Sequence, residues 1–120
     1  MGVGYQLVNW SRRERISFAH LPVNTRREIC GNPVSASIVA WYLATRQGDE
    51  VQFVPDQGEW PFPHGSFEEA LTYTDVTDLV IQELIGAQIL RDDGIEWADT
   101  DEPASVYIRA LKNIWMDGEP

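Results

Sequence analysis

Alternating hydrophobic and polar residues predict three short strands in the first half of the chain. Residues 3–9 alternate in this way, and residues 15–19 do so again after a polar interval. The interval, residues 10–14, is short enough to be a hairpin loop, so we expect these two strands to pair antiparallel. Residues 50–54 predict a third strand, because β-branched and aromatic residues are frequent there before Pro55 ends the pattern.

Hydrophobic residues at helical spacing predict two long helices and a third near the end of the chain. Asn32 followed by Pro33 is a strong helix start, since asparagine caps free N–H groups and proline fits the first helical position. This helix is expected to run to Arg46, with one stripe formed by Val34, Ile38, Trp41, Tyr42 and Thr45. The same period predicts helices over residues 75–85 and 103–115.

Two shorter signals complete the predicted order of elements. Asn24 is expected to cap a helical turn over residues 25–30. Asp93 and Gly94 stand between two apolar stretches and predict a tight hairpin turn. Together the elements predict an α+β fold: a single domain over all 120 residues, with one mainly antiparallel sheet and about three helices packed on it.

Charge is distributed unevenly along the chain. Residues 1–46 carry six arginines and two glutamates, whereas residues 47–120 carry three basic and seventeen acidic side chains. With a net charge of −10, the chain repels nucleic acid and anionic membranes, so we expect neither as a partner. There is no apolar stretch long enough to span a bilayer and no signal-peptide pattern, which predicts a soluble cytoplasmic protein.

The densest group of acidic residues lies between residues 92 and 102. Such a group favours docking of a basic partner, with tryptophans as anchors, because tryptophan is frequent at the centres of interfaces. The residues predicted to bind the partner are Asp92, Asp93, Glu96, Trp97, Asp99, Asp101, Glu102 and Trp60. An acidic surface that serves solubility alone fits the same residues equally well.

Residues with catalytic or metal-binding chemistry do not form a spaced motif. Cys30 is the only cysteine, His20 and His64 lie far apart, and residues 99–101 match only the first two ligands of a calcium loop. We therefore predict no catalytic residue, no metal and no cofactor. An alternative stays open, namely an enzyme whose pocket lies near the aromatic, proline-rich loop 55–67, with either histidine acting beside a carboxylate.

The function that these features favour is the binding of a basic protein. Bacterial immunity proteins that block nuclease toxins share this physical profile, since a toxin that binds nucleic acid is basic and an acidic blocker associates with it rapidly. This is an analogy of charge, not of motif. A self-associating structural subunit is the other alternative, because the basic N-terminal part and the acidic C-terminal part attract each other between copies.

Overall fold

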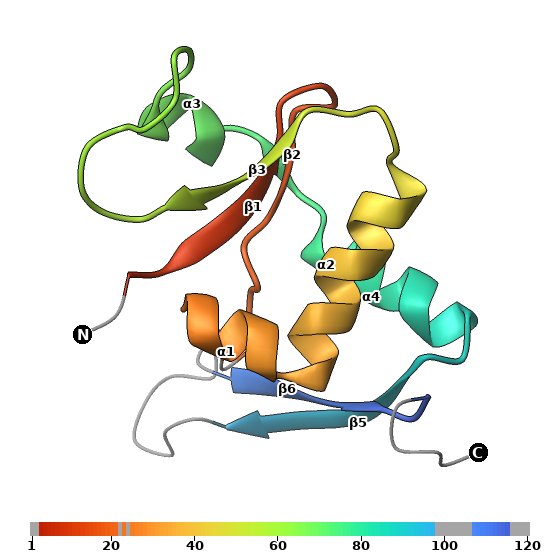
Figure 1. The fold of residues 1–120 in the computed structure, drawn as a ribbon. Helices are drawn as coiled ribbons and strands as arrows, with labels where there is room; N and C mark the ends of the chain where they lie inside the picture. Colours follow the sequence, from red (N-terminus) through yellow and green to blue (C-terminus); the bar gives the residue numbers. More distant parts are fainter. Residues whose placement is uncertain (1–2, 22, 24, 98–106, 116–120) are drawn as a thin grey trace.

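A mixed four-stranded sheet lies at the centre of this α+β fold (Figure 1). The structure is a computed structural model, and it describes residues 3–21, 23, 25–97 and 107–115. Its strands, in the order β3-β1-β2-β4, are β1 (Tyr5–Asn9), β2 (Glu14–Ile16), β3 (Val51–Pro55) and β4 (Thr74–Asp75). β1 pairs antiparallel with β2 and with β3, so the hairpin and the third strand are confirmed. β4 had no sequence signal, and it pairs parallel with β2.

Four helices accompany the sheet within the described residues: α1 (Arg26–Gly31), α2 (Pro33–Thr45), α3 (Phe67–Leu71) and α4 (Thr77–Gly86). The predicted start of α2 is confirmed, since the Asn32 side chain accepts hydrogen bonds from the backbone N–H groups of the first turn. α1 is capped by Thr25, which forms a capping box with Glu28. The predicted cap of α1, Asn24, lies outside the described residues.

The two faces of the four-stranded sheet are covered differently. Leu7 and Val8 are neighbours on β1, and their side chains point to opposite faces because strand side chains alternate. Leu7 belongs to the main core, which α1, α2 and α4 complete with Ile29, Ile38, Tyr42, Val80, Ile81 and Leu84. Val8 belongs to a smaller aromatic cluster under α3 and the loop that precedes it.

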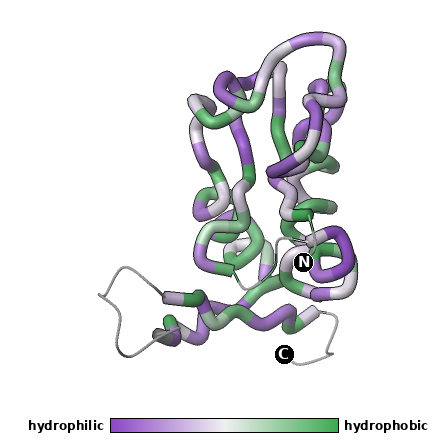
Figure 2. The backbone as a smooth tube through the Cα atoms, turned by 90° about the vertical axis from the view of Figure 1, so that its left-hand side faces the viewer, coloured by the Kyte–Doolittle hydropathy of each residue, from purple (hydrophilic) through white to green (hydrophobic). Residues whose placement is uncertain are grey.

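A second sheet corrects the prediction of a single sheet. It has two antiparallel strands, β5 (Leu90–Trp97) and β6 (Tyr107–Asn113), and forms a separate layer beneath the helices (Figures 1 and 2). β6 packs against α2 and β5 against α4. Leu90 and Leu111 join this layer to the main core.

The hairpin turn predicted at Asp93 and Gly94 is wrong. These residues lie inside β5, at a point where two residues of β5 face only Ala110 of β6. A two-residue hairpin turn and one common type of bulge both favour glycine at a position with positive φ, and Gly94 has φ of 101°. The local signal was therefore real, but it marks a bulge within one strand.

The helix predicted over residues 103–115 is also wrong. Residues 107–113 form strand β6, while residues 103–106 lie outside the described part of the chain. Apolar residues in this segment fit a helical stripe, but their backbone groups pair with β5, which lies earlier in the chain. Periodicity over so short a segment does not distinguish a helix from a strand, and the contact with β5 decides the outcome.

Candidate functional site

Four of the predicted binding residues, Asp92, Asp93, Glu96 and Trp97, lie on β5. The side chains of Asp92, Asp93 and Glu96 are all exposed there, and Trp97 is the last residue of the strand. The other acids predicted for this group, Asp99, Asp101 and Glu102, lie outside the described residues. The candidate site therefore consists of β5 and the elements that touch it.

Arginines hold two of these three carboxylates in place. The Arg91 guanidinium donates to both oxygens of Asp93, with Nε at 2.8 Å and Nη2 at 3.2 Å, and this hydrogen bonding lowers the pKa of Asp93. Arg109 of β6 donates to Asp92 at 3.2 Å and to Asp78 of α4 at 2.8 Å. Glu96, by contrast, forms no ion pair with any side chain in the described ranges.

A pocket of about 290 Å³ lies beside these acids. Its walls come from four segments: the chain after β2, the first turn of α2, and the two strands β5 and β6. Asp93 and Glu96 both line it, although residues three apart in a regular strand point to opposite faces. The bulge supplies one extra residue between them, which brings the two carboxylates to the same pocket.

The position of β6 in this pocket is set by contacts with distant parts of the chain. The backbone N–H of Arg109 donates to the carbonyl of His20 at 2.8 Å. The His20 ring stacks on Tyr107 with centroids 3.8 Å apart, and its Nδ1 donates to the Tyr107 carbonyl at 3.2 Å. At the other end of β6, the Asn113 side chain donates to the Pro33 carbonyl at 3.1 Å. His20 therefore helps to position a wall of the pocket.

Trp60, the remaining predicted anchor, lies in a different region. It is half-buried in the aromatic cluster on the far side of the four-stranded sheet, edge-on to Trp10 and Phe67, and its indole N–H donates to the His64 carbonyl at 2.8 Å. The loop that contains Trp60 and the β5–β6 layer are at opposite ends of the molecule (Figure 1). The structure therefore does not bring Trp60 to the acidic strand.

His64 has a carboxylate partner, as the enzyme alternative requires. Its Nε2 lies 3.1 Å from Oε2 of Glu50, and both side chains are more than half exposed. The backbone N–H of Glu50 donates to Ser11, and the His64 ring lies edge-on to Trp10. These contacts attach the aromatic loop to the sheet.

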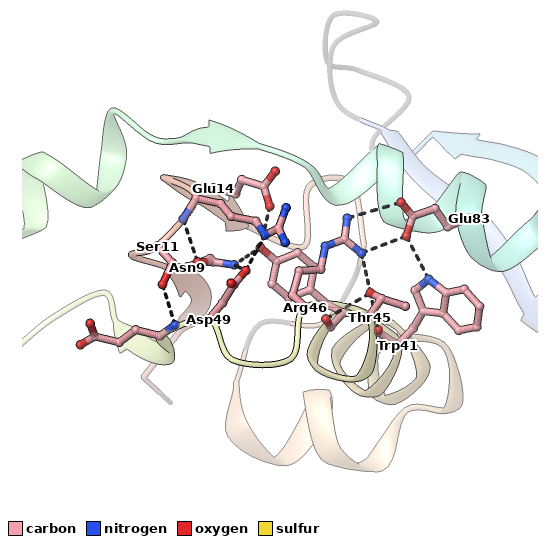
Figure 3. Close-up of polar contacts among 11 residues, drawn as sticks. Asn9, Ser11, Glu14, Trp41, Thr45, Arg46, Asp49 and Glu83 are labelled. Carbon is pink, nitrogen blue, oxygen red and sulfur yellow. Dashed lines mark hydrogen bonds and ion pairs between the residues drawn. The ribbon is translucent and has the colours of Figure 1, made fainter.

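A buried polar network is a feature that the sequence did not predict (Figure 3). Tyr42 was assigned to a stripe of α2, but its hydroxyl donates to Glu14 at 2.7 Å and accepts from Asn9 at 3.0 Å. Burial, and then the hydrogen bond to Glu14, raise the pKa of Tyr42. The Asn9 amide also donates to Asp49 at 2.8 Å. The partners are all protein groups, so the network joins β1, β2 and α2 to one another.

The described residues contain neither a cluster of metal ligands nor a membrane-spanning helix. Among the residues with described positions, no three His, Cys, Asp or Glu side chains gather closely enough to hold a metal ion. No helix in the described segments combines the length and hydrophobicity needed to cross a bilayer.

Comparison with protein-family models, with curated proteins and with solved structures finds no match for this chain.

Proposed function

We propose that this protein is an acidic binding module that neutralises or escorts a basic protein partner, as an immunity protein does with a basic toxin. The observation that supports this proposal is the exposed group of carboxylates on β5, where Glu96 has no counter-ion among the described side chains. The net charge of −10 supplies a long-range field that attracts a basic protein and accelerates the encounter.

The ion pairs on β5 support specific docking more than general attraction. Arg91 and Arg109 reduce the local charge, but they also hold the carboxylates of Asp93 and Asp92 in fixed positions. Carboxylates with fixed positions lose less side-chain entropy when a partner binds. Ile95, which is 51% exposed beside them, offers the apolar contact that interfaces combine with charge.

The test compares two double variants with the same change in charge. Asp93→Lys/Glu96→Lys changes the proposed surface, and Glu59→Lys/Glu68→Lys changes two exposed acids far from it. Asp92 is retained because it holds Arg109. Tagged wild-type protein is used to capture partners from the source cell's lysate at low salt, high salt elutes them, and mass spectrometry identifies them.

The proposal expects a basic protein that binds wild-type protein and the Glu59/Glu68 variant and is lost from the Asp93/Glu96 variant. Circular dichroism checks that both variants are folded. Equal capture by the wild-type protein and the Asp93/Glu96 variant contradicts the proposal, and so does equal loss from both double variants, since the effect is then one of net charge alone.

A second candidate, a small enzyme, is favoured by the 3.1 Å contact between His64 and Glu50, because a carboxylate that orients a histidine is a common arrangement for proton transfer. Thermal-shift screening of small molecules with wild-type protein and with His64→Ala tests it. A ligand that stabilises only the wild-type protein favours this candidate, whereas an equal response from both proteins removes His64 from consideration.

The third candidate, a self-associating subunit, is supported by Arg26 and Arg27, which are exposed on α1 and are opposite in charge to β5. Sedimentation at low and high salt tests it. Oligomers that dissociate as salt rises favour self-association, and a monomer at every salt concentration contradicts it.

A further inference from the structure

We propose that the pocket beside β5 and β6 receives one long cationic side chain, a lysine or an arginine, from the basic partner. This inference rests on the proposed function and adds to it the place where the partner is recognised. The size of the pocket, its apolar walls and its unbalanced negative charge support it, each independently of the others.

The size of the pocket suits a single side chain. Its volume of about 290 Å³ is at the lower limit of pockets that bind drug-sized ligands, which start near ~300 Å³. The apolar part of its wall is formed by Leu21, Val23, Val34, Ile108 and Leu111. Lysine and arginine bury a methylene stem against such walls while the charged end reaches polar groups at the rim.

Two polar groups in the walls, the Asn32 side-chain oxygen and the Ser35 hydroxyl, already have partners within the protein. The Asn32 side-chain oxygen accepts from the backbone N–H groups of Val34 and Ser35, and the Ser35 hydroxyl donates to the carbonyl of Ile29 at 2.9 Å. These groups therefore do not need a ligand to satisfy them, and the stem of a long side chain can lie against the first turn of α2 without leaving a buried group unpaired.

The charges around the pocket select a cation over an anion. The Arg109 charge is balanced by Asp78 and Asp92, and the Asp93 charge is balanced by Arg91, with Lys112 close enough to help lower the Asp93 pKa. Glu96 remains as the lining carboxylate that has no counter-ion among the described side chains. A cation that enters the pocket forms a charge-assisted hydrogen bond with Glu96, whereas an anion is repelled by it.

A second pocket has an arginine in its lining and no carboxylate. That pocket, of about 130 Å³, is lined by Tyr5, Arg26, Ile29, Cys30 and Phe53. It has apolar walls too, but its one charged lining residue is an arginine, so it repels a cation. At the β5–β6 pocket, by contrast, the charged lining residue without a counter-ion among the described side chains is a carboxylate, Glu96.

The experiment uses small probes and the full chain, so it does not depend on the partner's identity. ¹⁵N-labelled protein is titrated at low salt with Nα-acetyl-arginine amide and Nα-acetyl-lysine amide. Nα-acetyl-norleucine amide, which has an apolar side chain without charge, is the neutral control. We expect both cationic probes to shift the backbone resonances of Val34, Ser35 and residues 108–111, with saturation in the millimolar range, and the neutral probe to bind at least ~5-fold more weakly.

Two variants test whether Glu96 recognises the charge. Glu96→Gln keeps the shape of the side chain and is expected to weaken the cationic probes at least ~5-fold, with little effect on the neutral probe. Glu68→Gln removes the same charge from exposed α3 and is expected to leave binding unchanged. The spectra also report whether each variant is folded.

Three results overturn the inference: equal binding of cationic and neutral probes, shifts that lie away from the pocket, or an equal effect of the two variants. Failure of this inference is distinguishable from failure of the proposed function. If the probes bind with saturation but the Asp93→Lys/Glu96→Lys variant captures the partner as well as the wild-type protein does, the inference about the pocket stands and the proposed function is contradicted. If capture of the partner depends on these two residues but the probes do not bind, the proposed function is supported and the inference about the pocket is contradicted.

Discussion

The Asn9 side-chain amide donates a hydrogen bond to the Tyr42 hydroxyl at 3.0 Å, and both residues are completely buried. The contact joins the end of β1 to α2 across a sequence separation of 33 residues. The same hydroxyl donates to Glu14 on β2, so one oxygen atom links two strands and a helix. Tyr42 is therefore both a core residue and a centre of the polar network.

Tyr42→Phe is expected to lower the free energy of unfolding by about 1–3 kcal/mol, because one buried N–H of Asn9 loses its acceptor. Urea denaturation measures the loss. Tyr5→Phe is the matched control, since none of the hydrogen bonds found among described groups involves the Tyr5 hydroxyl, and its stability is expected to stay close to that of the wild-type protein. Equal stability of the two variants would show that the Tyr42 hydroxyl does not contribute.

Acidification is expected to destabilise the protein in part through Glu83. The hydrogen bond from Arg46 lowers the pKa of Glu83 below its ordinary value of 4.5, burial opposes this, and a hydrogen bond from Trp41 adds to it. The unfolded chain then binds a proton at higher pH than the folded protein does. This contribution to stability is therefore complete above pH 4.5 and is lost as pH falls through the lowered pKa of the folded state.

Glu83→Gln checks this assignment by urea denaturation at several pH values between about 6 and 3. The variant is expected to be less stable than the wild-type protein near neutral pH and to lose less stability on acidification, so the two curves converge. Curves that stay parallel would assign the acid sensitivity to other carboxylates, such as Asp75. Burial acts to raise the pKa of Asp75, but hydrogen bonds from Ser17 and Thr77 outweigh burial, so this pKa is lowered.

Gly65→Ala is expected to destabilise the aromatic cluster for two reasons. Gly65 has φ of 81°, which is unfavourable for alanine by about 1–2 kcal/mol, and the new Cβ would lie 3.3 Å from the Trp60 ring. Gly58→Ala is the matched control, because Gly58 has φ of 90° but no atom within 4 Å of that position. Urea denaturation followed by tryptophan fluorescence is expected to show a larger loss for Gly65→Ala, and equal losses would mean that the Trp60 contact relaxes freely.

Arg109→Met is expected to lower the free energy of unfolding by roughly 1 kcal/mol, because it breaks two ion pairs and leaves Asp78 and Asp92 close together without a cation. The Arg109 side chain is only 12% exposed, whereas Arg91 is 46% exposed in its pair with Asp93. Arg91→Met is therefore expected to cost less, and urea denaturation of both variants measures the difference. An equal or smaller loss for Arg109→Met contradicts its role as the link between α4 and β5.

Part of the candidate site was accessible from the sequence. The sequence predicts one group of acids between residues 92 and 102, and its described members, Asp92, Asp93 and Glu96, lie on one strand, because residues close in sequence stay close in space. The pocket was not predictable, since its walls come from four segments that no local pattern relates. The predicted anchor Trp60 lies in a separate aromatic cluster for the same reason: hydrophobicity indicates that a tryptophan is buried, but not against which residues.

Elements whose signals are local can be predicted from the chain alone. Asn32 and Pro33 start α2 through hydrogen bonds and backbone geometry within one turn, and the β1–β2 hairpin joins residues that are close in the chain. The strand at residues 107–113 and the bulge at Gly94, by contrast, depend on contacts between segments that are distant in the chain. Both outcomes depend on pairing between β5 and β6, and such a contact supplies backbone hydrogen bonds that override the helical spacing of the apolar side chains.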